Sequence, residues 1–454
     1  MPTTPSPTPL PPALADALNH HCYCQTLDAD LLRQAIGRDA GLCAMASTLA
    51  QTHPHLFSNT AVFVSQATVL AVQGAVAALE RTLSLPAWAQ HALPTSSAMA
   101  QADHGPQGVF MGYDFHLTPT GPQLIEINTN AGGAMLNAVL LRAQAKCCDL
   151  MQSSMQAYRD LDTLEDDFVA MFRAEWALFL QAKGQAQRPL RSIAIVDEAP
   201  NSQYLAPEFA LFADLFQRHG IEAVVADAAS LKLLDGQLFN GHLALDLVYN
   251  RLTDFDLSAP AHAALAQAYA QDLAAVTPHP RAHALRANKQ HLVTLGYAPA
   301  LQALGVTPAD QQTLLATVPA SERVGPHNAQ ALWEQRKQFF FKPLDGFGAR
   351  AVYRGDKLTK KVWEQIQAGD YIAQTLVPPP VRAVQVAGAA TELKFDVRAY
   401  TYGGQVQLLA ARTYSGQTTN FRTEGGGFAP VLVAPELGAT TWGGARPPAG
   451  TLGA

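Results

Sequence analysis

Basic blocks, long apolar runs and an even cysteine count are all missing from this 454-residue sequence. Charged residues make up only 15% of it and the net charge is -6, so we expect no nucleic acid partner. No run of about 18 apolar residues occurs, so no membrane span is expected. The start, MPTTPSPTPLPP, lacks the features of a signal peptide and predicts a disordered tail over residues 1–12.

Cysteine is scarce and unevenly placed. The five cysteines all lie in the first third of the chain, and an odd number in a long sequence argues against a disulfide framework. We therefore expect a reducing, cytoplasmic location. A zinc site at His20, His21, Cys22 and Cys24 is the alternative use of two of them, but no second ligand pair with suitable spacing follows.

The length allows two or three domains that each bury a core. Composition and periodicity change along the chain from helical, to alternating strand and helix, to strand-rich, and the end is rich in glycine and proline. The predicted units are a tail (1–12), a helical region (13–190) that contains a strand hairpin (108–133), a βαβ substrate-binding domain (191–284), a strand-rich nucleotide-binding part (285–432) and a loose tail (433–454).

Residues 191–251 show the pattern of a βαβ unit. The strands RSIAIVDE, IEAVVA and LALDLVYNR flank a helix that begins near Pro207 and ends at Gly220, which predicts a parallel sheet. Ligands of such sheets bind beyond the carboxyl ends of the strands. Tyr204 and Arg251 follow two of these strands and are candidate substrate-binding residues. A surface salt bridge is the alternative for Arg251.

The stretch LIEINTNAGG is a predicted strand that ends in two oxygen-bearing side chains. Glu126 and Asn128 lie two residues apart, so they share one face of the strand. Hard oxygen ligands on one face suit magnesium. The alternative is that both residues cap a turn, which Asn and acidic residues favour.

A second strand, QFFFKP, ends in a lysine and a glycine loop. Lys342 closes the apolar run, and Gly346 and Gly348 in DGFGAR allow backbone amides to approach an anion. The lysine precedes the glycines, so this is not the Walker loop. The alternative is an ordinary hairpin with a surface lysine.

Two further strands, KFDVRAYTY and QVQLLAARTY, flank a predicted turn at Gly403 and Gly404. Asp396 and Arg398 share a face of the first strand, and Arg412 ends the second. The segment TTNFRTEGGGFAP then places Asn420 and Arg422 before three glycines, and we expect this segment to form a mobile lid.

In type and order these segments resemble the ATP-grasp superfamily. The EIN-type metal strand comes early in this chain, whereas most of that superfamily ends with it. The order resembles eukaryotic-type glutathione synthetase and glutathionylspermidine synthetase-like ligases, which implies a circularly permuted ATP-grasp fold of α+β lobes with an inserted parallel βαβ domain. The segments that carry the resemblance are LIEINTNAGG, DLVYNR, ANKQHLV, FFFKP, YIAQTLV, FDVRAY and NFRTEGGG.

The resemblance implies an ATP- and magnesium-dependent ligase that joins a carboxylate to an amine through an acyl phosphate. The implied roles are ATP binding by Lys289, Lys342, Gly346, Gly348 and Gln374; binding of one or two magnesium ions by Glu126, Asn128 and Asp396; catalysis by Arg412 and Arg422; and substrate binding by Arg251, Tyr204, Asn420, Gly426 and Gly427.

Two departures from glutathione synthetase bear on the substrate. GVFMGYDF has no arginine where that family carries one before its metal strand, and Glu424 replaces a lysine of its glycine-rich segment. Both departures put the glutathione precursor in doubt as the substrate. The alternatives to a ligase are a small-molecule phosphotransferase and a nucleotide-binding protein without ligase activity. A homodimer is expected from the resemblance and from the frequency of two-fold oligomers.

Overall fold

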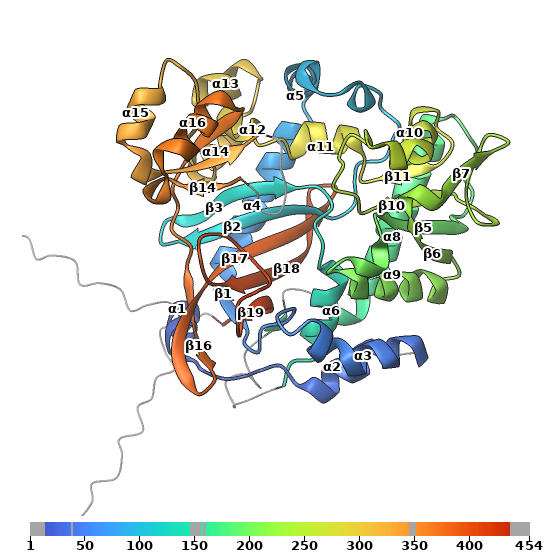
Figure 1. Ribbon diagram of the computed structural model, residues 1–454, viewed down its shortest axis with the longest axis horizontal. Coiled ribbons are helices and arrows are strands. Elements are labelled where there is room, and N and C mark those ends of the chain that lie inside the picture. The colour runs from blue at the N-terminus through green and yellow to red at the C-terminus, as the bar shows by residue number, and fades with distance from the viewer. Residues whose placement is uncertain (1–13, 38–39, 146–155, 158–159, 345–350, 436–454) are drawn as a thin grey trace, which may run out of the picture.

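The computed structural model describes residues 14–37, 40–145, 156–157, 160–344 and 351–435. Figure 1 shows a large sheet at the centre, a parallel-sheet unit at its right and a smaller lobe at its upper left. The α/β fold class is thereby confirmed. No described helix is long and apolar enough to cross a bilayer.

The central sheet has eight strands in the described part of the chain and joins segments that are far apart in sequence. Its main path is β1-β19-β18-β17-β2-β3, with β16 beside β17 and β4 beside β19. The turn between β17 and β18 forms at Gly403 and Gly404, both with positive φ, as the sequence predicts. Its strands are β1 (Val62–Ser65), β2 (Met111–Thr118), β3 (Gly121–Asn128), β4 (Gln156–Ala157), β16 (Val381–Val386), β17 (Ala389–Tyr402), β18 (Gln405–Tyr414) and β19 (Gly427–Ala434).

Two features of this sheet differ from the expectations. β1 lies in a region expected to be helical, and it pairs in parallel with β19. β19 also runs to Ala434, past the predicted boundary at residue 432. A four-residue strand between helices is too short to show a period of its own, which explains why β1 was missed.

The two faces of the central sheet have different neighbours. Helix α4 (Gln66–Leu83) packs on one face, where Tyr113, Val397 and Ala411 join Val72 and Leu79 in one buried cluster. Because strand side chains alternate, the residues next to these in sequence point to the opposite face. That opposite face carries the charged residues described below.

The parallel-sheet unit forms as predicted and contains more strands than expected. Its order is β11-β10-β5-β6, all parallel, and a hairpin sheet, β7-β8-β9, is inserted between β6 and β10. Pro207 lies in the first turn of α9, and Gly220 follows the helix with positive φ. The strands are β5 (Ser192–Asp197), β6 (Glu222–Asp227), β7 (Leu231–Leu234), β8 (Gln237–Asn240), β9 (Leu243–Ala244), β10 (Leu247–Asn250) and β11 (Ala275–Thr277).

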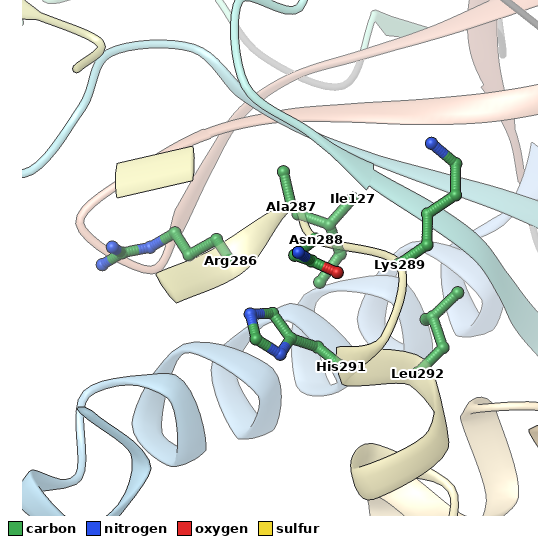
Figure 2. Close-up of a pocket in the computed structure, with 7 residues that line it drawn as sticks. All are labelled: Ile127, Arg286, Ala287, Asn288, Lys289, His291 and Leu292. Atoms are coloured by element: carbon green, nitrogen blue, oxygen red, sulfur yellow. The ribbon is translucent and has the colours of Figure 1, made fainter. Parts of the chain in front are cut away.

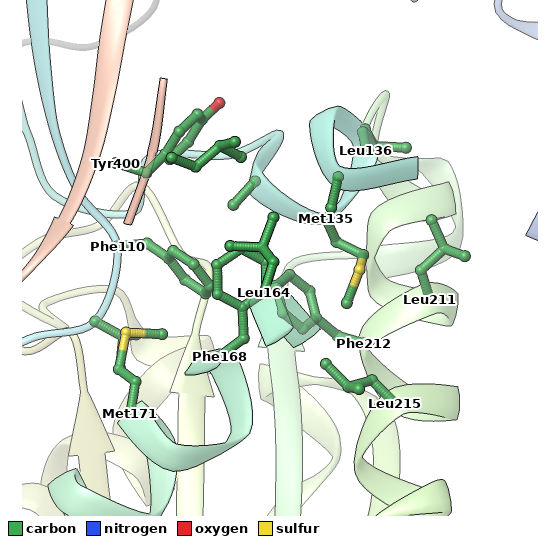
Figure 3. Close-up of a cluster of buried hydrophobic side chains, with 14 of the residues drawn as sticks. Phe110, Met135, Leu136, Leu164, Phe168, Met171, Leu211, Phe212, Leu215 and Tyr400 are labelled. Atoms are coloured by element: carbon green, nitrogen blue, oxygen red, sulfur yellow. The ribbon is translucent and has the colours of Figure 1, made fainter. Parts of the chain in front are cut away.

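A cluster of aromatic residues packs between this unit and the central sheet. Phe110 precedes β2 and meets Phe168 of α8 edge-on, with 4.9 Å between ring centroids, and it also contacts Phe212 of α9. Figure 3 shows these rings together with Tyr400 of β17 and Met135 of α6. The aromatic residues along one face of α8 are therefore part of the hydrophobic core.

The smaller lobe has its own sheet, ordered β12-β15-β13-β14, in which the neighbouring pairs are antiparallel. Phe341 of β13 packs with Trp363 and Ile366 of α16 in a separate buried cluster. The strands are β12 (Ser321–Arg323), β13 (Phe339–Pro343), β14 (Tyr353–Arg354) and β15 (Tyr371–Thr375).

Helices occupy much of the region that was predicted to be helical, but α12 to α16 lie within residues 285–432, which the sequence pattern predicted to be strand-rich. Their bounds are α1 (Leu14–His21), α2 (Ala29–Ile36), α3 (Ala40–Thr52), α5 (Pro86–Ala92), α6 (Ala134–Arg142), α8 (Leu161–Ala182), α9 (Ala206–Arg218), α10 (Ala263–Ala270), α11 (Pro280–Arg286), α12 (His291–Leu295), α13 (Ala298–Ala303), α14 (Pro308–Thr317), α15 (Ala329–Glu334) and α16 (Lys360–Ala368).

Candidate active site

Charged side chains lie in mid-strand on the central sheet face that α4 does not cover. Arg398 of β17 is opposite Asp114 of β2, and Asp396 of β17 is opposite Arg412 of β18. Asp114, Asp396 and Arg398 are buried. Burying charges without partners costs several kcal/mol each, so charges in this position need close partners.

Asp114 is the centre of this charged face. It accepts two hydrogen bonds from Arg398, at 2.6 and 2.7 Å, and one from Arg412 Nη2 at 2.7 Å. Burial alone would raise the pKa of Asp114, but the charges and hydrogen bonds of the two arginines outweigh it and hold the pKa well below its usual range. Asp114 therefore stays ionised and fixes both guanidinium groups.

Arg412 connects three of the carboxylates. Its Nε donates to Asp396 Oδ1 at 2.8 Å, and its Nη2 donates to Asp114. Glu126 also acts on it through charge, and these anions hold its pKa above the ordinary arginine value although burial works the other way. The other oxygen of Asp396 accepts a hydrogen bond from Thr419 Oγ1 at 2.6 Å.

Glu126 and Asn128 end β3 beside Asp114. The amide nitrogen of Asn128 donates to Asp114 Oδ2 at 3.0 Å and to Glu126 Oε1 at 3.4 Å. The amide oxygen of Asn128 therefore remains available as an acceptor. The register of the β2–β3 pairing shifts just after Asp114. The oxygens of Glu126, Asn128 and Asp396 are the hard donors that magnesium prefers, so the donor set fits that ion. Among the described residues, no three His, Cys, Asp or Glu side chains already converge as metal ligands.

Lys342 brings a cation to this face from the smaller lobe. It is buried, and its Nζ donates to the carbonyl of Ile125 in β3 at 2.7 Å. Burial lowers the pKa of Lys342 to about 8, with Lys289 adding to the decrease and Glu126 opposing it. The amine is thus partly neutral near pH 8 and would gain from a nearby anion.

Lys289 lines a small pocket between α11, α12 and β3. The pocket is shallow and is lined by Ile127, Arg286, Ala287, Asn288, Lys289, His291 and Leu292. Figure 2 shows the Lys289 side chain extending toward β3, whereas Arg286 points away from it. Lys289 and Lys342 are close enough for the charge of one to lower the pKa of the other.

The remaining predicted ATP-binding residues are placed unequally. Gln374 is buried in β15, between Ser321 of β12 and Phe340 of β13, and its Nε2 has no hydrogen-bond partner within the described ranges. Gly346 and Gly348 lie outside the described residues. Their ATP-binding roles stay predictions.

Arg251 and Tyr204 lie at the carboxyl ends of β10 and β5, away from the charged face. Arg251 is buried, whereas the alternative interpretation, a surface salt bridge, would require it to be exposed. Its Nη1 donates to the Tyr249 hydroxyl at 3.0 Å, and its Nη2 lies 3.5 Å from the Glu208 carboxylate. Glu208 also accepts hydrogen bonds from the amides of Gly133 and Met135 at the start of α6. Arg251 thus joins the parallel-sheet unit to the turn that follows β3, and its substrate-binding role stays a prediction.

The segment between β18 and β19 carries the other predicted residues. Asn420 turns inward: its Oδ1 accepts from the Arg422 amide at 2.9 Å, and its Nδ2 donates to Ser415 O at 2.9 Å. Arg422 is exposed. Gly426 and Gly427 are buried where β19 begins, and a Cβ on them would lie 2.6 Å from Thr413 O and 2.7 Å from His55 O, respectively. Close backbone packing is what these two glycines serve in this structure.

Comparison with solved structures finds a fold similar to that of this chain. No family model matches the sequence, and no curated protein matches it. The chain is similar to the solved structure of a glutathione synthetase-like effector, GSS30, from Globodera pallida, with 12% identity, a TM-score of 0.52, and coverage of 90% of this chain and 98% of that chain. It is also similar to a gamma-glutamylcysteine synthetase-type protein from Methylobacillus flagellatus, with 10% identity, a TM-score of 0.40, and coverage of 79% and 85%.

The fold of this chain is similar to that of the glutathione synthetase-like effector. In this fold, the residues predicted from the resemblance separate into two groups. Glu126, Asn128, Asp396, Arg412 and Lys342 meet on the charged face, with Lys289 near them. The other described residues lie at the edge of the parallel sheet, in the β18–β19 segment or within the lobe.

Two residues of the charged face had no predicted role. Asp114 was not singled out, and Arg398 was noted only as sharing a face with Asp396. The available signal was alternation: in MGYDFHL, Asp114 is a lone charge in an apolar strand. Its two arginine partners lie 284 and 298 residues away, so only the pairing of β2 with β17, and of β17 with β18, reveals its role in the glutathione synthetase-like fold.

Proposed function

We propose that this chain is an ATP- and magnesium-dependent ligase that joins a carboxylate to an amine through an acyl phosphate. The observation that carries the proposal is the charged face of the central sheet. Asp114, Asp396 and Arg398 are buried in mid-strand there, Arg412 pairs with both carboxylates, and Lys342 reaches this face from a second lobe. A protein gains no stability from such an arrangement over an apolar one, which supports a functional reason for it.

The proposed roles follow from the contacts. Arg412 and Lys342 neutralise phosphate charge, and Asp114 holds Arg412 and Arg398 in place. Glu126, Asn128 and Asp396 hold magnesium, which when bound supplies charge stabilisation to the phosphates. Phosphoryl transfer needs positioning and fixed charge more than a protein nucleophile, and this face offers both.

The structure also bears on the carboxylate substrate. A Cβ placed on Gly112 would lie 2.5 Å from the Ala131 Cβ and 3.4 Å from Arg398 Nε. The space beside Gly112 is therefore taken first by Ala131, in the turn after β3, and then by Arg398 of the neighbouring strand. Together with the missing arginine in GVFMGYDF, this supports a donor other than the glutathione precursor.

The test is ADP release from ATP and magnesium in the presence of pooled amino acids, small peptides and polyamines. A pool whose amine accelerates release, together with an amide product found by mass spectrometry, would support the ligase. Release stimulated only by hydroxyl compounds would favour a phosphotransferase. Tight ATP binding with no release from any pool would favour a nucleotide-binding protein.

A matched variant separates the metal assignment from stability. Glu126→Gln removes one carboxylate that no arginine hydrogen-bonds directly among the described contacts, so the fold should persist. We expect it to lose most magnesium-dependent ADP release while its thermal unfolding stays near that of the parent. Unchanged release at limiting magnesium would remove Glu126 from the metal set.

A further inference from the structure

The segment between β18 and β19, residues 415–426, touches three separate regions of the molecule; we name it the β18–β19 loop. Thr419 in the loop donates to Asp396 on the charged face at 2.6 Å. Ser58, in the N-terminal region before β1, donates to the carbonyl of Gly425 at 3.0 Å. The third contact is aromatic and comes from the parallel-sheet unit.

That aromatic contact centres on Phe421. Its ring lies 5.4 Å from Tyr204, which precedes α9, and 4.8 Å from Phe428 of β19. On its other side, Tyr204 lies 5.1 Å from the ring of His53. The rings of His53, Tyr204, Phe421 and Phe428 thus form a row that joins the N-terminal region, the parallel-sheet unit and the loop. Such centroid distances are those of favourable aromatic pairs.

Hydrogen bonds within the β18–β19 loop connect its residues, so a contact that restrains one residue restrains the others. Asn420 accepts from the amide of Arg422 and from the Thr423 hydroxyl, and it donates to Ser415. Ser415 in turn donates its amide to Thr423 at 3.0 Å. Gly416 and Gly425, near the two ends of the loop, have positive φ. The hydrogen bonds join residues 415, 420 and 423, so we expect the loop to move as one unit.

We propose that Tyr204 and Phe421 form a latch that holds the β18–β19 loop closed over Asp396, with Tyr204 as a positioning residue. Tyr204 belongs to the β5–α9 connection, at the edge of the parallel sheet where ligands of such sheets bind. A ligand that moves this connection changes the latch, and the latch changes the hold of Thr419 on Asp396. The latch itself does not depend on the proposed ligase function. Only the purpose of the closed loop rests on that function, because the closed loop would exclude water from the acyl phosphate.

The latch differs in a measurable way from direct substrate binding by Tyr204. The aromatic ring makes the contact with Phe421, whereas a substrate-binding role would use the hydroxyl. Tyr204→Phe keeps the ring, so the loop should stay closed as in the parent protein. Tyr204→Ala removes the ring and should release the loop.

Limited trypsin digestion tests the latch without any enzymatic activity. Arg422 is exposed in the loop, so opening makes the bond after it accessible, and its cleavage follows the open population. Because an aromatic pair is worth about 0.5–1.5 kcal/mol, we expect Tyr204→Ala to speed that cleavage roughly two- to tenfold. Tyr297→Ala, which removes an exposed tyrosine of the other lobe, is the matched control and should change nothing.

The outcomes are decisive either way. Faster appearance of the fragment beginning at Thr423 in Tyr204→Ala, and not in Tyr204→Phe or Tyr297→Ala, supports the latch. Equal cleavage in all four proteins would overturn it. Faster cleavage in Tyr204→Phe as well would also overturn it, because the hydroxyl and not the ring would then hold the loop.

A second measurement addresses the consequence for chemistry. Once an amine acceptor is known, the ratio of amide to ADP reports how often water captures the acyl phosphate and returns the carboxylate with free phosphate. We expect this ratio to fall in Tyr204→Ala and to be restored in Tyr204→Phe. If the parent protein releases no ADP at all, the ligase proposal fails, whereas the digestion still decides the latch.

Discussion

The central sheet and the parallel sheet carry their buried charges in different places. The central sheet has them in mid-strand, where Asp114, Asp396, Arg398 and Arg412 are paired at 2.6–2.8 Å. The parallel sheet has an apolar interior and carries Asp197 at a strand end, beside Asp227 of β6. Strand-end carboxylates cap turns in many proteins, whereas mid-strand charges serve no local structural need. The central sheet is thus the stronger functional indication.

The pKa values of one carboxylate in each sheet also shift in opposite directions. Arginines lower the pKa of Asp114 despite its burial, whereas burial raises the pKa of Asp197 to about 6, with Glu198 and Asp227 adding to the increase. The stability that Asp114 contributes is complete above its unfolded pKa of about 3.8 and is lost only as the pH falls below that. Asp197 does the reverse: stability falls as the pH rises from about 3.8 to about 6, because the folded state holds the proton longer.

The largest expected effect comes from breaking the centre of the charged face. Asp114→Asn leaves Arg398 and Arg412 buried without their shared counter-charge, so we expect a loss of about 3–5 kcal/mol in the free energy of unfolding. Urea denaturation at pH 7 measures it. A loss below about 1 kcal/mol would mean that the charged face is not held by Asp114.

Lys342→Met tests the cation that the second lobe supplies. We expect ATP affinity to fall by about 1.5–3 kcal/mol, the usual contribution of a charged hydrogen bond, with little change in stability because a buried charge is removed at the same time. In the parent protein, ATP binding should weaken as the pH rises above about 8, where Lys342 loses its proton. Calorimetric titration at pH 7 and 9 measures both, and the exposed Lys337→Met is the control. Equal affinity in the Lys342 variant would contradict phosphate binding there.

Asp197→Asn sharpens the contrast with Asp114. Replacing a carboxyl whose ionisation burial opposes should raise the free energy of unfolding at pH 8 by on the order of 1 kcal/mol, allowing for partial solvent screening. The same variant should lose the fall in stability between about pH 3.8 and 6. A destabilised variant at pH 8 would show that Asp197 is paired after all.

The smallest expected effect on stability is that of Arg422→Gln. Arg422 is exposed, so the free energy of unfolding should stay within about 0.5 kcal/mol of the parent value. If Arg422 stabilises charge in the reaction, ADP release should nevertheless fall sharply. Full activity would remove Arg422 from the catalytic set and leave Arg412 as the catalytic arginine.

Local patterns explain which parts of this site the sequence predicts. Glu126 with Asn128, and Asp396 with Arg398, are pairs two residues apart, and period-2 alternation alone puts each pair on one face. Their meeting point was predicted only through the resemblance. The pairing of Asp114 and the Glu208–Arg251 pair could not be predicted from the sequence, because the partners are distant along the chain. Glu208 and Arg251, for example, lie 43 residues apart, on different elements.

The order of strands in the central sheet has a consequence for how this protein is made. β2 and β3 are synthesised long before β17, although β17 covers the edge of β2 and supplies the partner of Asp114. On the ribosome, the first hairpin therefore waits with an open edge and an unpaired carboxylate while more than half of the chain emerges. The parallel sheet, whose strands all lie between Ser192 and Thr277, can assemble in that interval. Its aromatic core against Phe110 would then give the waiting hairpin a first surface to fold on.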